Sequence, residues 1–188
     1  MRRIITLRKH KENNIYSYLI LTNFNYLKHM ENTKKVAANA ATAFIANGDL
    51  RLSDHFKLRE FTLSGAAIRY NLDNTPTTVE VERLRALCVN VLEPLRHRFG
   101  VLRITSGYRS ERVNKIVGGA ARSQHRLGEA ADIHVSSLEV AQKMCRFVKE
   151  HLDFDQLILE SVAKTGARWI HVSYKATGNR REFFTLKR

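Results

Sequence analysis

The sequence predicts an α+β domain, in which helices flank a small, mostly antiparallel sheet. Two segments, residues 79–99 and 138–152, carry apolar side chains at the spacing of an amphipathic helix. Four shorter segments have the apolar or alternating character of strands: residues 101–106, 129–135, 154–160 and 169–175. Helices come first and strands mixed with two helices follow, which is an order expected of an α+β fold.

The domain-like part of the chain begins near Leu52, where residues 52–64 read LSDHFKLREFTLS. Ser53 is a residue type that commonly caps helices, so a helix is expected to begin close to it. The apolar residues of this segment are expected to anchor it in the core: Phe56, Phe61 and Leu63.

The long helix over residues 79–99 follows a turn at residues 74–76, and either Thr77 or Thr78 can cap it. Pro94 falls late in the helix and is expected to kink it or to end its regular part. One stripe of the helix is apolar and predicts the face that packs on the core: Val81, Leu84, Cys88, Val91, Leu92 and Leu95.

The middle of the domain carries the first two strands. Residues 101–106 are expected to form a strand and residues 111–117 a short helix, after which a glycine-containing loop leads to the strand over residues 129–135. Because side chains alternate along a strand, Asp132 and His134 share one face. The opposite face is apolar and consists of Ala131, Ile133 and Val135.

The last part of the domain combines a helix and a hairpin. Ser136 or Ser137 can cap the helix over residues 138–152. Residues 154–160 and 169–175 are then expected to pair as an antiparallel hairpin. The apolar stripe of this helix consists of Val140, Ala141, Met144, Cys145, Val148 and Leu152.

The chain is strongly basic, with a net charge of +14 over 188 residues. Such a surplus favours an anionic partner: nucleic acid, a membrane surface or a cell-wall polymer. The surplus is concentrated at the ends, since residues 1–29 hold six Lys/Arg against one Glu and residues 175–188 hold five against one. No segment approaches the roughly 20 apolar residues of a membrane span, so we expect none.

Residues 1–49 are interpreted as an N-terminal extension and residues 50–188 as the functional domain. Met30 is one candidate for the natural start, which would leave the preceding stretch without a role; an N-terminal helix packed on the domain is the other interpretation. Residues 15–22 are too short and tyrosine-rich for a standard signal peptide, and no small-residue cleavage site follows them. The only two cysteines, Cys88 and Cys145, lie at apolar helical positions and predict buried thiols rather than a disulfide.

A compact motif carries the strongest chemical signal. Ser123, His125, Gly128 and Asp132 form the pattern S-x-H-x-x-G-x-x-x-D, and His171 follows in the last strand-like segment. If these strands share a sheet, His125, Asp132 and His171 can converge on one face as three ligands of a catalytic zinc. Three protein ligands leave a fourth position for water, whose pKa zinc lowers towards ~7. Taken singly, each residue is more often an ordinary polar group.

Arg109 and Ser123 are candidate substrate-binding residues. Arg109 follows the strand at 101–106, where a fixed guanidinium could grip a substrate carboxylate or a developing oxyanion. A structural salt bridge with Glu111 or Asp132 is the alternative role. Ser123 either donates a hydrogen bond to the substrate or shapes the loop that precedes His125.

Glu160 is the candidate general base. A symmetric hairpin register pairs Glu160 with Trp169 and Ile158 with His171. This register places Glu160 on the face that carries His171, one diagonal step away and within reach of a long side chain. The alternative is an ordinary carboxylate at the end of the hairpin.

Three segments together resemble the zinc D-Ala-D-Ala peptidase family, particularly its short single-domain members from bacteria and phages. They are residues 106–110 (SGYRS), 123–132 (SQHRLGEAAD) and 169–172 (WIHV). The likeness covers roughly residues 52–175. It implies a hedgehog/DD-peptidase-like fold and zinc held by His125, Asp132 and His171, with Arg109 aiding the substrate or the transition state. Cleavage of peptidoglycan stem peptides, by a carboxypeptidase or an endopeptidase, is the implied activity.

The chain departs from the family at one position. Several members carry their acidic base three residues before the last histidine, where this chain has Arg168. The departure leaves two interpretations open: Glu160 or another group takes the role, or the chain is a zinc-stabilised module that binds wall peptide without cutting it. Nucleic-acid binding is suggested by charge alone and no recognition motif supports it.

The leading hypothesis is therefore a monomeric zinc metallopeptidase that acts on the cell wall. A phage or prophage endolysin suits the basic ends, which would favour an anionic wall. It also suits the lack of a standard signal peptide, because such an enzyme can leave the cytoplasm at lysis.

Overall fold

The computed structural model describes Lys28, Met30, Glu31 and residues 50–187. Nearly all of the proposed extension over residues 1–49 lies outside this description. Residues 50–187 form the predicted α+β fold, with helices and a five-stranded, mostly antiparallel sheet. No helix in the described part of the chain is both long and apolar enough to cross a membrane.

The sheet has the strand order β1-β2-β4-β3-β5. Its neighbours pair antiparallel except β3 and β5, which run parallel. The predicted hairpin register is confirmed, because Glu160 pairs with Trp169 and Ile158 with His171. The strands are β1 (Ile104–Ser106), β2 (Ala130–His134), β3 (Gln156–Ser161), β4 (Arg168–Ser173) and β5 (Glu182–Lys187). The sequence prediction lacked β5.

The predicted long helix consists of three consecutive parts: α4 (Thr78–Leu87), a π-helical segment η1 (Cys88–Leu92) and α5 (Glu93–Phe99). Pro94 explains the middle part. Its ring crowds the carbonyl one turn earlier and it lacks an N–H, and the wider π turn accommodates both defects. The helix therefore continues past Pro94, and its predicted apolar stripe is buried throughout.

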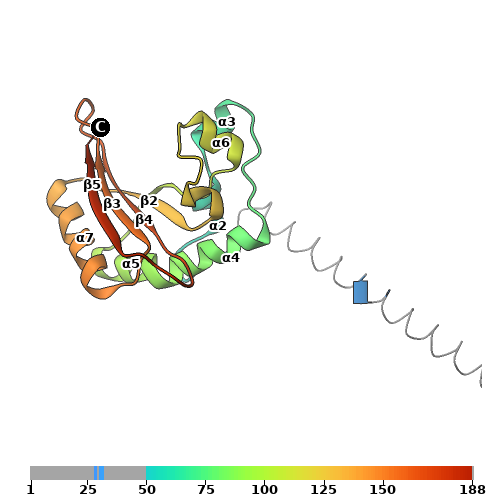
Figure 1. Cartoon of the computed structure of the whole chain (residues 1–188), viewed down its shortest axis with the longest axis horizontal. Coiled ribbons are helices and arrows are strands. Elements are labelled where there is room, and N and C mark those ends of the chain that lie inside the picture. The colour runs from blue at the N-terminus through green and yellow to red at the C-terminus, as the bar shows by residue number, and fades with distance from the viewer. Residues whose placement is uncertain (1–27, 29, 32–49, 188) are drawn as a thin grey trace, which may run out of the picture. The chain divides into compact units, whose positions relative to one another are not determined.

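One face of the sheet packs on the helices and forms the core. The side chains that point to this face include Ile133, Leu159 and Ile170, all buried. They pack with residues of α4, α5 and α7 (Leu138–His151), helices that lie along the sheet in Figure 1. Cys88 and Cys145 are buried free thiols within the same core, as predicted. The opposite face of the sheet is left for the functional site.

Four short helices occupy the loops around that second face: α2 (Leu58–Thr62), α3 (Gly65–Arg69), α6 (Glu111–Ile116) and the 3-10 turn η2 (Gln124–Leu127). Helices α2, α3 and α6 gather away from α7 (Figure 1). Two local expectations are wrong. Lys57, not Ser53, caps the first of these helices. Leu63 is 60% exposed, because α2 ends at Thr62 and buries only Leu58 and Phe61.

Candidate active site

Three side chains from separate elements converge on the free face of the sheet. His125 comes from η2, Asp132 from β2 and His171 from β4, and the last two are direct partners in the β2–β4 register. His125 Nε2 lies 3.1 Å from Asp132 Oδ1 and 3.1 Å from His171 Nδ1, and the latter two atoms are 2.9 Å apart. We call these residues the His/Asp trio.

Backbone geometry fixes the orientation of His125. Its Nδ1 lies 2.6 Å from the carbonyl oxygen of Gly107, which can only accept, so Nδ1 carries the hydrogen. Gly107 packs against α2 so closely that a Cβ atom would lie 2.5 Å from Phe61 Cβ. Gly128 ends η2 in a left-handed conformation with a φ of 70°, and a Cβ there would meet the backbone of Glu80. Positions 107 and 128 therefore both need glycine, because a larger residue at either would displace the backbone that orients His125.

The trio fits a metal ion. Burial lowers the pKa of His125, so its ring is neutral at pH 7 and Nε2 offers a lone pair. Burial also acts to raise the pKa of Asp132, but the two histidines that crowd it lower this pKa well below its usual range. Nε2 and the ionised Oδ1 therefore face each other as two acceptors, an arrangement that a cation between them would stabilise. Tetrahedral zinc holds N and O ligands at about 2.0–2.1 Å, hence about 3.3 Å from one another, close to the distances found.

A cleft of about 670 Å³ opens over the trio and is lined by the other candidate residues as well. Glu160 is 6% exposed and lines the cleft on the strand next to His171. Ser123 also lines it and precedes η2 as the cap residue. Arg168, in contrast, is not among the lining residues. Strand alternation places it on the face of Ile170, away from the cleft.

Arg109 contacts the trio directly. Its Nη2 donates to Asp132 Oδ2 at 2.7 Å and its Nε donates to Ser106 Oγ at 2.8 Å. Of the two salt bridges considered from the sequence, the one with Asp132 is present. Glu111 instead pairs with Arg126, at 3.5 Å. Because Arg109 also lines the cleft, it can orient Asp132 and present its remaining donors to a ligand.

Comparison with known families places this geometry in context. A sequence model of the family described as Peptidase M15 matches residues 54–173, which include the whole trio, Arg109, Ser123 and Glu160. The chain belongs to the M15 peptidase family. M15 peptidases are zinc-dependent metallopeptidases, so the two histidines and the aspartate form a donor set appropriate to the family. A comparison with curated proteins found no match.

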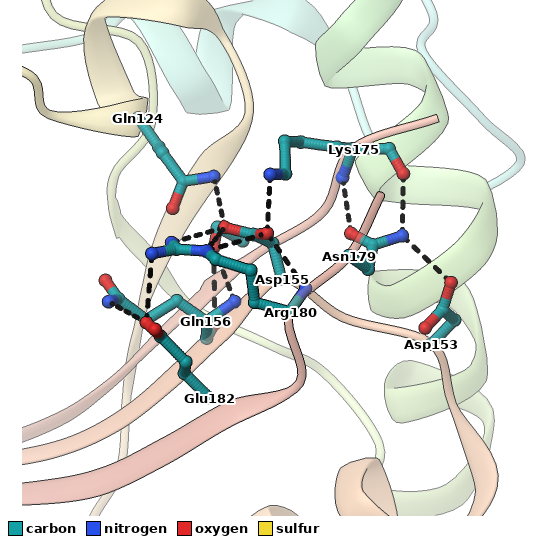
Figure 2. Close-up of polar contacts among 9 residues, drawn as sticks. Gln124, Asp153, Asp155, Gln156, Lys175, Asn179, Arg180 and Glu182 are labelled. Carbon is teal, nitrogen blue, oxygen red and sulfur yellow. Dashed lines mark hydrogen bonds and ion pairs between the residues drawn. The ribbon is translucent and has the colours of Figure 1, made fainter. Parts of the chain in front are cut away.

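Sequence reasoning missed a buried ionic network beneath the cleft of this M15 peptidase. Asp155 is fully buried and accepts from Arg180 Nη2 at 2.6 Å and from Lys175 Nζ at 2.7 Å. Gln124, the neighbour of His125, donates to the same carboxylate at 3.0 Å (Figure 2). The residues of this network are far apart in sequence, and no motif joins them. No signal in the sequence indicated that these residues would meet.

Replacing Asp155 with asparagine is expected to lower the free energy of unfolding by about 2–3 kcal/mol, because two cations lose a buried counterion. Although burial raises the pKa of Asp155, hydrogen bonds from Arg180 and Lys175 lower it well below its usual range. A carboxyl with a lowered pKa stabilises the fold above the pKa of the unfolded chain, about 3.9, and this contribution fades as the pH falls further. Urea unfolding from pH 7 to 3 should thus show the difference between the two proteins shrinking below about pH 4.

The matched control is Asp153→Asn, in the same network but with a side chain that is 58% exposed. It should cost less than about 1 kcal/mol, as exposed ion pairs do. Equal losses in the two variants, or a loss in Asp155→Asn that does not depend on pH, would contradict the role given to the buried carboxylate.

Proposed function

We propose that this M15 peptidase cleaves peptidoglycan stem peptides, as a D-Ala-D-Ala carboxypeptidase or a related endopeptidase. The observation that carries the proposal is the convergence of His125, Asp132 and His171 at the floor of an open cleft that Glu160 and Arg109 also line. A purely structural zinc site would close its fourth position with another protein ligand, whereas this trio faces the cleft.

Each residue then has a distinct role. The trio holds zinc, which when bound supplies a Lewis acid that activates water and polarises the peptide carbonyl. Glu160 accepts the proton of the attacking water and passes it to the departing amine. Arg109 stabilises negative charge on the substrate while it orients Asp132. Ser123, at the cleft wall, either donates to the peptide or holds the loop.

The charge of the cleft supports an anionic peptide as substrate. Three arginines line it, Arg109, Arg122 and Arg180, against the carboxylates of Glu160 and Asp132. Stem peptides present a terminal carboxylate, and guanidinium groups bind such a planar anion with two hydrogen bonds. The net charge of +14 favours an anionic partner such as the cell wall. We propose as its setting a monomeric endolysin that reaches the wall after release from the cytoplasm.

The decisive experiment is digestion of stem peptides that end in D-Ala-D-Ala, with products identified by mass spectrometry. Loss of the last residue alone indicates a carboxypeptidase, and an internal cut indicates an endopeptidase. A chelator should stop the reaction and added zinc should restore it. Zinc binding without cleavage of any stem peptide would favour the second candidate, a non-catalytic wall-binding module, which the arginine at position 168 keeps open.

Arg109→Lys tests the role of the guanidinium. The variant keeps the charge but loses the fork, so kcat/KM on the stem peptide should fall about 100-fold, the effect of losing one donor to a developing oxyanion. Zinc content should stay the same at saturating zinc. Arg112→Lys, at an exposed position of α6, is the matched control and should behave like the unmodified protein. Zinc loss with unchanged turnover per bound zinc would show that Arg109 serves only Asp132.

A further inference from the structure

A second group of metal-ligating side chains lies outside the cleft. Among the described residues, His55, Glu93 and His97 form a set whose donor atoms all lie within 4.8 Å of one another. Glu93 Oε2 is 2.8 Å from His55 Nδ1 and 3.9 Å from His97 Nε2. None of the three lines the cleft over the His/Asp trio. We call this group the α5 cluster.

The fold holds the central carboxylate of the α5 cluster in place. Glu93 begins α5 and His97 lies one helical turn later, so both side chains project from the same face. The backbone N–H of His55 donates to Glu93 Oε1 at 2.8 Å. That bond occupies one carboxylate oxygen and leaves Oε2 facing the two imidazoles.

The environment suits a metal ion that enters from solvent. The side chain of Glu93 is 11% exposed, while those of His55 and His97 are 40% and 70% exposed. Burial acts to raise the pKa of Glu93, but Ser53 and His55 lower it below its usual value, so the carboxylate is charged at neutral pH. Glu93 is therefore held in place and ionised, and the more exposed side chain of His97 has room to adjust.

The α5 cluster repeats the composition of the His/Asp trio. Its histidine rings meet edge to face at 5.5 Å and 87°, and those of His125 and His171 meet at 5.0 Å and 61°. Two imidazoles and one carboxylate suit zinc and neighbouring transition metals. We propose that the α5 cluster is a second, structural zinc site, separate from the one in the cleft.

Such an ion would fasten the start of the domain to its long helix. His55 lies in the loop between Arg51 and Lys57, which pair in an isolated bridge, and the loop inserts Leu52 and Phe56 into the core. A metal shared with α5 would hold this loop against Glu93. Because a metal that binds only the folded chain raises its stability, zinc should stabilise the domain through this cluster even when the trio is disabled.

The test measures zinc per chain by elemental analysis of the full, untagged protein after dialysis, together with the Tm. The unmodified protein should hold about two zinc ions, and His97→Ala and His171→Ala about one each. In the His171→Ala background, zinc at roughly 100 times its dissociation constant should raise the Tm by about 5–10 °C. Adding His97→Ala to that background should remove this rise and weaken zinc binding at least about 100-fold.

His151→Ala is the matched control, since His151 is an exposed histidine of α7 outside both groups, and it should keep both ions and the full rise in Tm. A single zinc that only trio substitutions remove would overturn the proposal. So would a second zinc that survives both His55→Ala and His97→Ala. Peptidase activity plays no part in these readouts, so the proposed function and the second site can fail independently.

Discussion

His171→Ala is expected to abolish peptidase activity, with kcat/KM on stem peptide falling about 10⁴-fold or more. Several kcal/mol of transition-state stabilisation depend on the metal, and each 1.4 kcal/mol is a factor of ten. His171 Nδ1 lies within 3.1 Å of both other donor atoms, so its loss leaves only two ligands from the trio. The measurement is steady-state hydrolysis with parallel determination of zinc content, which should fall by one ion per chain.

Two controls separate loss of the metal from loss of the fold. His151→Ala removes an exposed histidine of α7 and should keep full activity. Circular dichroism should show an intact fold for His171→Ala, because His171 lies on the cleft face and not in the core cluster. Activity within tenfold of the unmodified protein in a variant shown to lack this zinc would refute a catalytic metal at the trio.

Glu160→Gln is expected to lower kcat by about 10²–10⁴-fold, the usual contribution of a positioned general base. Glutamine has nearly the same shape but cannot accept the proton of water at neutral pH. Glu160 is buried at the cleft, and its pairing with Trp169 lies two residue pairs along the hairpin from the pairing of Ile158 with His171, so both pairs face the same side of the sheet. The measurement is kcat and KM separately, together with zinc content. Loss of a base should lower kcat and leave KM and zinc content nearly unchanged.

Glu150→Gln makes the same chemical change at an exposed position of α7 and should have no effect. Full activity in Glu160→Gln would remove Glu160 from the base role. If activity falls in proportion to bound zinc, Glu160 instead helps to position the metal ligands.

Much of the fold could be predicted because its elements have clear local patterns. The apolar stripe of α4–α5 is buried, and so is most of that of α7, but Val140 is 38% exposed and was wrongly placed in the stripe. The aliphatic side chains of β2, β3 and β4 are buried as well. Strand β5 escaped prediction because it lies at the sheet edge with both Phe183 and Phe184 partly exposed, so no period of two separates core from solvent. The π turn also has no signal of its own beyond Pro94.

The residues of the candidate site could be predicted for a different reason. The hairpin register fixed which residues face His171, and strand alternation fixed the face of Asp132, so Glu160 and Asp132 could be placed by counting. What counting could not provide is contact between distant loops. Glu93 and His55 are 38 residues apart, and Asp155 and Gln124 are 31 apart. Such pairs follow from how helices and loops pack, which local periodicity does not encode.

The network around Asp155 also determines where the chain can be truncated without loss of the fold. The family match ends at residue 173, yet Lys175, Arg180 and β5 all come later. A fragment that stops at the match would leave Asp155 buried without its two cations and would expose the backbone of β3 along its whole length. Gln124, the neighbour of His125, would then donate to a carboxylate that no longer has a fixed position. The boundary drawn by homology is therefore narrower than the unit able to fold by itself.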